Sequence, residues 1–96
     1  MAAYVIIDIE ISDPDSYAQL IELVTPTVEN NNGKFVARGG AIEPILGGWA
    51  PQRIAIIEFG SMDDVHAWLT APEHVALSGR RDQSATNIKV IAVDGL

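Results

Sequence analysis

The feature that most constrains the fold is the order in which strand-like and helix-like patterns follow one another. Runs rich in β-branched residues, which are typical of strands, occupy Tyr4–Ile11, Lys34–Gly39, Arg53–Phe59 and Asn87–Val93. Apolar residues at helical spacing fill the first and third connections. The order β-α-β-β-α-β predicts an α+β, ferredoxin-like domain with an antiparallel four-stranded sheet and helices on one face. With 96 residues, the chain is expected to form a single domain over residues 1–96.

The first helical stretch carries its own start and stop signals. Asp13 can cap the helix, with Pro14 at its first position. Pro26 lies inside the pattern, so we expect it to kink or split the helix, because proline removes one backbone hydrogen bond. Gly33 is a natural residue to follow the helix end.

The second helical stretch has similar signals. Ser61 and Asp64 are spaced as a capping box, in which Ser61 caps the helix and Asp64 reaches back. Trp68 shares the apolar stripe of this helix and is expected to be a core residue. Pro72 breaks the pattern and can begin a further short helix that runs through Arg81.

The two faces of the predicted sheet differ, because side chains alternate along a strand. The apolar face suits the helices and consists of Val5, Ile7, Ile9, Ile11, Phe35, Ala37, Ala55, Ile57 and Phe59. The mixed face consists of Tyr4, Ile6, Asp8, Glu10, Val36, Arg38, Ile54, Ile56 and Glu58. Its aliphatic side chains each gain ~1.5–3 kcal/mol on full burial, whereas its charges are costly to bury unpaired. We therefore expect a homodimer that packs through this face of the sheet.

Glycine pairs stand at both ends of the long connection between the second and third strands. Gly39 and Gly40 directly follow Arg38 and allow a bulge or a sharp bend. Gly47 and Gly48 allow a turn before Trp49. Between the pairs, Ile42–Leu46 can continue the second strand along a sheet edge.

Composition excludes several classes of function. The net charge is −7, from 6 basic and 13 acidic residues, which argues against partners that need clustered lysine and arginine, namely nucleic acids and anionic membranes. The absence of cysteine excludes disulfides and thiolate catalysis, and it fits a cytoplasmic protein. The start of the chain is interrupted by Asp8 and Glu10, so it is expected to be a strand and not a signal peptide. No apolar run approaches the ~20 residues of a membrane span.

Several stretches together resemble a known family. They are "NGKFVARGG", "LGGW", "PQRIAIIEF" and "AWLTAPEH", together with Tyr17 in the first helix and Arg81 after the second. Over nearly its whole length the chain resembles the domain of unknown function (DUF) 1330 family, a branch of the dimeric α+β barrel proteins. Two positions depart from the family's pattern: Gly33 follows asparagine where a glycine pair is usual, and His74 stands where tyrosine is commoner.

The resemblance implies the ferredoxin-like fold and the dimer. Proteins of the wider dimeric α+β barrel superfamily include cofactor-free monooxygenases, haem-degrading enzymes, lactone isomerases and binding or stress proteins. A fold alone does not choose among such functions.

Three residues are candidates for catalysis. Arg38 can hold a carboxylate or an enolate through two parallel hydrogen bonds, or it can form an interface salt bridge with Asp8, Glu10 or Glu58. Glu58 can act as a base if burial raises its pKa, or it can remain ionised beside Arg38. His66 has the pKa best suited to proton transfer, although it lies one residue off the apolar stripe of its helix.

Four residues are candidates for ligand contact. Trp49 can wall a pocket and stack on a planar ligand, or it can cover a dimer seam. Arg53 can contact the ligand or simply frame the loop that precedes it. Tyr17 and Arg81 belong to the motifs that carry the family resemblance. No metal is expected, because His66 and His74 match no ligand spacing, and no cofactor is expected.

Three functions remain open at this level. The first is a small enzyme without a cofactor that acts on a planar anionic or carbonyl-bearing metabolite, with Arg38 stabilising negative charge and His66 or Glu58 moving a proton. The second is a small-molecule binding or sensing module without turnover. The third is a dimer whose mixed face serves only as an interface.

Overall fold

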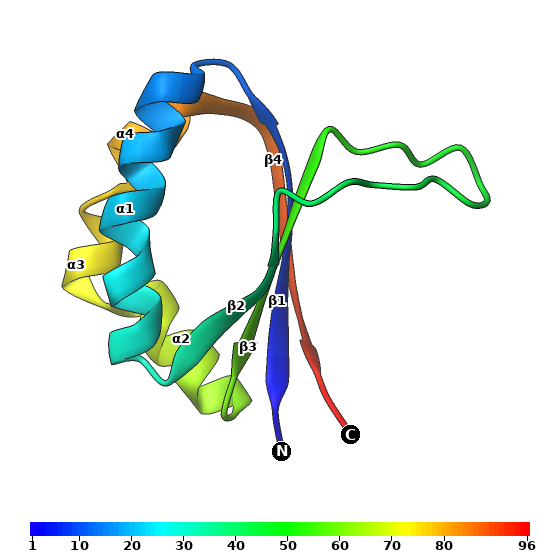
Figure 1. Cartoon of the computed structure of the whole chain (residues 1–96). Helices are drawn as coiled ribbons and strands as arrows, with labels where there is room; N and C mark the ends of the chain where they lie inside the picture. The colour runs from blue at the N-terminus through cyan, green and yellow to red at the C-terminus, as the bar shows by residue number, and fades with distance from the viewer.

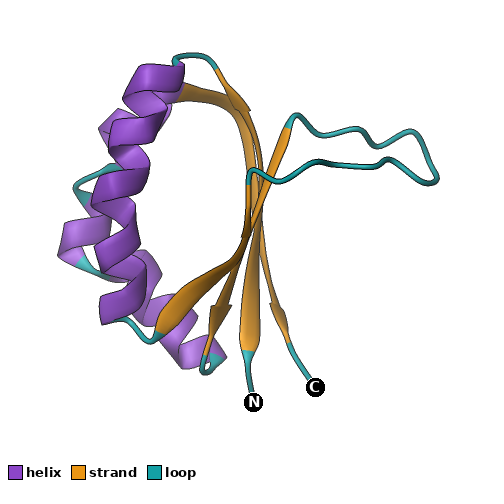
Figure 2. Ribbon diagram, in the orientation of Figure 1, coloured by secondary structure: helices purple, strands orange, loops and turns teal.

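The computed structural model describes residues 1–96 throughout. The elements in chain order are β1 (Ala3–Ile11), α1 (Pro14–Asn30), β2 (Gly33–Arg38), β3 (Arg53–Phe59), α2 (Met62–Thr70), α3 (Pro72–Val75), α4 (Ser78–Ser84) and β4 (Ala85–Asp94). The strands form one sheet in the order β2-β3-β1-β4, and all neighbouring strands are antiparallel. All four helices cover the same face of this sheet (Figure 1). The predicted α+β, ferredoxin-like class is confirmed, and the sheet of the single chain is open rather than closed into a barrel (Figure 2).

Helix α1 begins as its sequence predicts. The Asp13 carboxylate accepts a hydrogen bond from the backbone N–H of Ser16 at 3.2 Å and so satisfies one of the free donors of the first turn. Of the two outcomes expected at Pro26, a kink or a split, the split is wrong, because α1 continues through it as one element to Asn30.

The end of α1 also differs from the prediction. The residue with a positive φ is Asn32, at 65°, and not Gly33. Asparagine tolerates this left-handed conformation better than most residues do. Gly33 instead begins β2, where a Cβ atom would lie 2.6 Å from the Phe59 ring and 2.9 Å from Val28 Cγ1. Close packing of the strand against the core therefore requires glycine at this position.

The second helical segment is divided into three short helices. Ser61 Oγ accepts from the backbone N–H of Asp64 at 3.1 Å, which confirms Ser61 as the cap of α2. The reciprocal half of the capping box is absent, because the Asp64 carboxylate accepts from Asn32 Nδ2 at 2.9 Å. The short helix expected from Pro72 through Arg81 is broken into α3 and α4.

The core between the sheet and the helices consists of two buried clusters. The first contains Ala3, Val5, Val28, Ile57, Phe59, Val65 and Trp68. The second contains Ile9, Tyr17, Leu20 and Ala85. Ile7 and Val24 are only partly buried, and they pack against both clusters. The core is therefore divided, and its two parts meet around these two side chains.

A β-bulge in β2 changes which residues face the helices. Phe35 pairs with Ile57, but the next pairs are Ala37 with Ile56 and Arg38 with Ala55, so Val36 is an extra residue. The inserted residue reverses the alternation that follows it. Two predicted placements are consequently wrong: Ala37 lies on the open face of the sheet, and Arg38 lies on the face that the helices cover.

The loop of residues 39–52 forms an arm on the open face of the sheet (Figure 1). The predicted extension of the second strand over Ile42–Leu46 is absent, because no residue of the arm belongs to a strand. Ile45 and Leu46 are each 90% exposed. Near the base of the arm, Trp49 Nε1 donates to Asp8 Oδ2 of β1 at 3.1 Å. The arm is therefore attached to its own sheet at its base and carries bare apolar side chains farther out.

Candidate functional site

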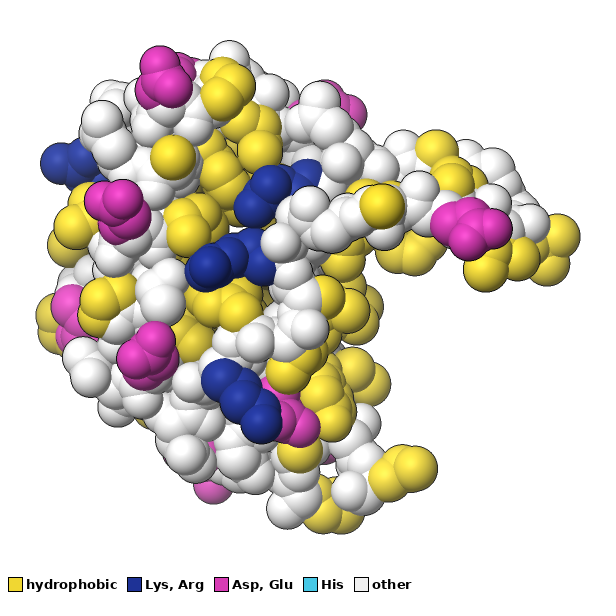
Figure 3. All heavy atoms as spheres, in the orientation of Figure 1, with side chains coloured by type: hydrophobic (Ala, Val, Ile, Leu, Met, Phe, Trp, Pro, Cys, Tyr) yellow, Lys and Arg dark blue, Asp and Glu magenta, His cyan; other side chains and the backbone are white.

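A cavity of about 280 Å³ lies between the helix layer and the sheet, where the two core clusters meet. Its size is close to the lower end of the ~300–1,000 Å³ typical of ligand sites. Of the 17 lining residues, 14 are hydrophobic. The hydrophobic ones are Ile7, Ile9, Tyr17, Leu20, Ile21, Val24, Phe35, Ala55, Ile57, Trp68, Leu69, Leu77, Ile88 and Val90. Figure 3 shows apolar side chains at the bottom of a hollow between α1 and the edge of the sheet, with basic side chains across its opening.

Arg38 lies at this opening because the β2 bulge directs it toward the helices. Its Nη1 donates to Thr25 Oγ1 of α1 at 3.2 Å, and its Cζ lies 4.5 Å from the centre of the Phe35 ring. Phe35 itself lines the cavity. The guanidinium group therefore stacks on one wall of the cavity and keeps most of its N–H donors free.

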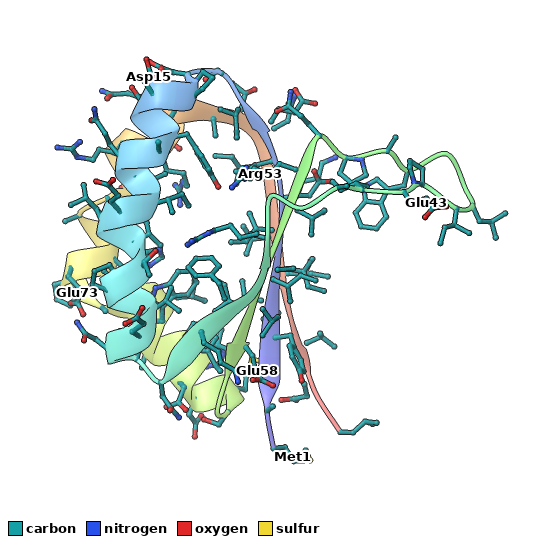
Figure 4. All side chains as sticks on the ribbon, viewed as in Figure 1. Met1, Asp15, Glu43, Arg53, Glu58 and Glu73 are labelled. Carbon is teal, nitrogen blue, oxygen red and sulfur yellow. The ribbon has the colours of Figure 1, made fainter.

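Arg53 enters from the start of β3, on the same side of the sheet as Arg38. Its Cζ lies 5.0 Å from the centre of the Tyr17 ring, another lining residue, and Figure 4 shows the side chain directed toward α1. Its guanidinium group also lies against Gly39, where a Cβ atom would be 2.5 Å from Nη1. The Nε atom of Arg53 is buried and has no hydrogen-bond partner.

No carboxylate neutralises Arg38 or Arg53. The ion pairs of the chain join Lys34 to Glu58 and Arg81 to Asp82, each at 3.3 Å. Within the chain, Arg38 therefore forms no salt bridge with Asp8, Glu10 or Glu58. Two cations without a carboxylate partner therefore lie on neighbouring strands of a chain whose net charge is −7.

The three lining residues that are not hydrophobic, His74, Ser78 and Arg81, come from α3 and α4. The His74 ring stacks on the Trp68 ring, with 4.1 Å between centroids and 20° between planes. Its Nδ1 lies 3.1 Å from the backbone oxygen of Trp68. Burial is the main cause that holds the pKa of His74 below its usual 6.5, and the charge of Arg81 acts in the same direction.

The structure separates the predicted site residues into two groups. Arg38, Arg53, Tyr17 and Arg81 lie at or around the cavity. The remaining three, Glu58, Trp49 and His66, do not line the cavity.

Glu58 and Trp49 lie on the open face of the sheet. Glu58 accepts from the Tyr4 hydroxyl at 3.1 Å and pairs with Lys34, and the hydrogen bond to Glu58 is the main cause that raises the pKa of Tyr4. Trp49 is 62% exposed. His66 is exposed on α2 and does not line the cavity. The arrangement therefore brings together arginines, apolar walls and His74, in place of the predicted set of Arg38, Glu58 and His66.

The polar groups around the cavity suit organic ligands more than metals. No group of three or more histidine, cysteine, aspartate or glutamate side chains is placed to hold a metal ion. The free guanidinium donors can bind a carboxylate or an enolate oxygen, and a neutral imidazole can accept a proton. No helix of the chain is both long enough and apolar enough to cross a membrane.

Sequence reasoning did not identify His74 as a cavity residue. The residue directly follows a helix start in "TAPEH", where periodicity gives no direction for the side chain. The available signal was the resemblance itself, in which His74 stands at a position where tyrosine is commoner.

The chain as a whole matches a known family model. The model described as "Domain of unknown function (DUF1330)" matches residues 2–96. No protein with a curated description matches the chain.

Solved structures with the same fold are distant in sequence. A protein of unknown function from Rhodopseudomonas palustris is 15% identical, with a TM-score of 0.81 over 99% of this chain and 82% of that one. A dimeric ferredoxin-like protein of unknown function from Jannaschia sp. CCS1 is 14% identical, with a TM-score of 0.77 over 99% and 100% of the two chains. SnoaB, a cofactor-independent oxygenase from Streptomyces nogalater, is 10% identical, with a TM-score of 0.73 over 99% and 93%. At these identities the likeness shows the fold alone.

Proposed function

The chain belongs to the DUF1330 family, and we propose that it binds a small, largely apolar molecule that carries an anionic or enolisable carbonyl group. The apolar body of the ligand occupies the cavity, and its oxygen atoms meet Arg38 and Arg53. The single observation that carries the proposal is the pair of arginines at the cavity opening without a carboxylate partner.

The guanidinium charges of Arg38 and Arg53 have no carboxylate partner in the chain. Arg38 pairs with Ala55, two residues from Arg53, so the two side chains are diagonal neighbours on one face of the sheet. Like charges at this separation repel, and the buried Arg53 Nε lacks an acceptor. A bound carboxylate or enolate relieves the repulsion between the two arginines, because it supplies negative charge and several acceptor positions at once.

The test uses 2-naphthoate as an anionic probe and 2-methylnaphthalene as its neutral counterpart. We expect the double variant Arg38→Gln/Arg53→Gln to bind 2-naphthoate about tenfold or more weakly, because charge-assisted hydrogen bonds are lost. Its affinity for 2-methylnaphthalene should not change. Arg80→Gln is the matched control, because Arg80 is exposed on α4 and does not line the cavity. Equal loss in the control, or no binding of either probe by the wild type, refutes the proposal.

A second candidate is turnover of such a ligand without a cofactor. The fold itself is compatible with such a reaction, because SnoaB, which shares it, is described as a cofactor-independent oxygenase. In this role Arg38 and Arg53 stabilise negative charge that develops on a carbonyl oxygen. Native mass spectrometry of the purified protein identifies a co-purified ligand by the extra mass of the complex. Incubation of that ligand with the protein in air then distinguishes turnover from binding. Recovery of the ligand unchanged leaves binding alone.

We further propose that the protein is a homodimer that packs through the open face of the sheet. Ile6 lies between Ile56 and Ile91 on this face, and Ile91 is 61% exposed. Several similar structures are described as dimeric. Ile91→Lys should shift the chain toward the monomer in sedimentation velocity, whereas Val75→Lys on α3, where Val75 is 52% exposed, should not. A wild-type monomer at micromolar concentration refutes this assembly.

A further inference from the structure

The cavity is lined by one histidine, which the proposed ligand contacts do not use. His74 lies in the wall built from α3 and α4, and it lines the cavity together with Ser78 and Arg81. The stacked indole of Trp68 fixes the plane of its imidazole ring. Trp68 is itself held by a hydrogen bond from Nε1 to Thr27 Oγ1 at 3.0 Å, and it is only 4% exposed. The position of the imidazole is therefore set by a rigid part of the core.

One hydrogen bond determines which ring nitrogen of His74 carries the proton. Nδ1 lies 3.1 Å from the backbone oxygen of Trp68, and a carbonyl oxygen can only accept. Nδ1 must therefore be the N–H of the neutral ring, which leaves a lone pair on Nε2. Nε2 has no hydrogen-bond partner within the chain, and it is not among the occluded polar atoms. An acceptor is thus available on a residue that lines the apolar cavity.

We propose that Nε2 of His74 is the proton acceptor of the cavity and that the ligand class is a phenol or an enol. The ligand's hydroxyl donates to Nε2. If the reaction proceeds, the O–H bond breaks, the proton bonds to Nε2, and the electron pair remains on the oxygen as a phenolate or enolate. This inference rests on the proposed binding function of the cavity but not on the arginine pair.

Burial, assisted by the charge of Arg81, lowers the pKa of His74 and so keeps the ring available as an acceptor. Burial lowers the pKa of the imidazole, and Arg81 of α4 lowers it further, while Glu73 on α3 and the backbone oxygens of Trp68 and Leu69 act in the opposite direction. The net direction favours the neutral ring. Arg81 lines the same wall of the cavity, where its guanidinium group is paired with Asp82 at 3.3 Å.

The first measurement is the tautomeric state by ¹⁵N NMR of the imidazole groups. The chain has two histidines, so exposed His66 is an internal reference. We expect His74 to be protonated at Nδ1 at pH 7.5, and we expect 2-naphthol to shift the Nε2 resonance. The probe 2-methoxynaphthalene, which cannot donate a hydrogen bond, should not shift it. Protonation at Nε2, or no response to 2-naphthol, overturns the proposal.

The second measurement compares affinities for the same two neutral probes. In His74→Phe, which keeps an aromatic ring against Trp68, the preference for 2-naphthol over 2-methoxynaphthalene should fall about fivefold to tenfold, which is the effect of one lost hydrogen bond. His66→Phe should leave the preference unchanged. An unchanged preference in His74→Phe overturns the role of His74. Because both probes are uncharged, failure of the arginine proposal with 2-naphthoate is a separate result.

Discussion

Gly39→Ala should lower the free energy of unfolding, whereas Gly40→Ala should not, although the two glycines are adjacent. Gly39 has a φ of +70°, and a Cβ atom there would lie 2.5 Å from Arg53 Nη1 and 2.7 Å from Cζ. Gly40 has open space within 4 Å and no positive φ. The pair therefore separates a glycine that the site requires from one that it tolerates.

The magnitude follows from two terms at Gly39. Left-handed backbone costs an L-residue about 1–2 kcal/mol. The clash is relieved if the Arg53 guanidinium swings away, which gives up its contact with the Tyr17 ring, about 0.5–1 kcal/mol. Alanine also restricts the unfolded chain, which offsets about 0.4–1 kcal/mol. The net loss of unfolding free energy is about 1–2 kcal/mol, whereas Gly40→Ala should be neutral or stabilising by about 0.4–1 kcal/mol.

Urea unfolding at fixed protein concentration measures this difference directly. The 2-naphthoate affinity should also fall in Gly39→Ala, because Arg53 is displaced, and it should stay unchanged in Gly40→Ala. The reasoning is refuted if the two variants unfold at the same urea concentration, or if Gly39→Ala loses stability but keeps full affinity for 2-naphthoate.

Three further perturbations test the cap, the core and the imidazole. Ser61→Ala should lower the unfolding free energy by about 1 kcal/mol in urea titrations, because the cap of α2 is lost. Trp68→Phe should lower it by about 2 kcal/mol, because ring volume and the hydrogen bond to Thr27 are lost; a change below about 0.5 kcal/mol contradicts the packing described. The wild type should lose stability as pH falls below 6.5, because the unfolded chain protonates His74 before the folded chain does. The loss of unfolding free energy between pH 7.5 and pH 5.5 should be smaller in His74→Phe than in His66→Phe. If urea titrations give the same loss for both variants, the lowered pKa of His74 is contradicted.

The fold could be predicted from sequence because its signals are local and repeated. The order of patterns depends on periods of two and 3.6 residues sustained over whole elements, and the caps at Asp13 and Ser61 need only nearby backbone. Pro26 does not split α1, because the packing of α1 onto the sheet outweighs one missing backbone hydrogen bond.

The site could be predicted only in part, because it depends on one inserted residue. The alternation in "KFVAR" continues across Val36 without a break in the sequence, so the bulge was not visible and Arg38 was assigned to the wrong face. Glu58 pairs instead with Lys34, its cross-strand neighbour before the bulge. His74 required knowledge of how α3 lies against Trp68, which is a contact between elements and not a property of either sequence.

The divided core has a consequence for how this protein responds to its ligand. Two buried clusters flank a cavity of about 280 Å³, so a bound molecule would complete the hydrophobic interior as if it were a missing side chain. Folding and binding are then thermodynamically linked, and a ligand at 100 times its Kd adds about 2.7 kcal/mol to the unfolding free energy. The melting temperature thus becomes a reporter of occupancy, and a thermal-shift screen of aromatic acids and phenols can find the ligand without knowledge of any reaction.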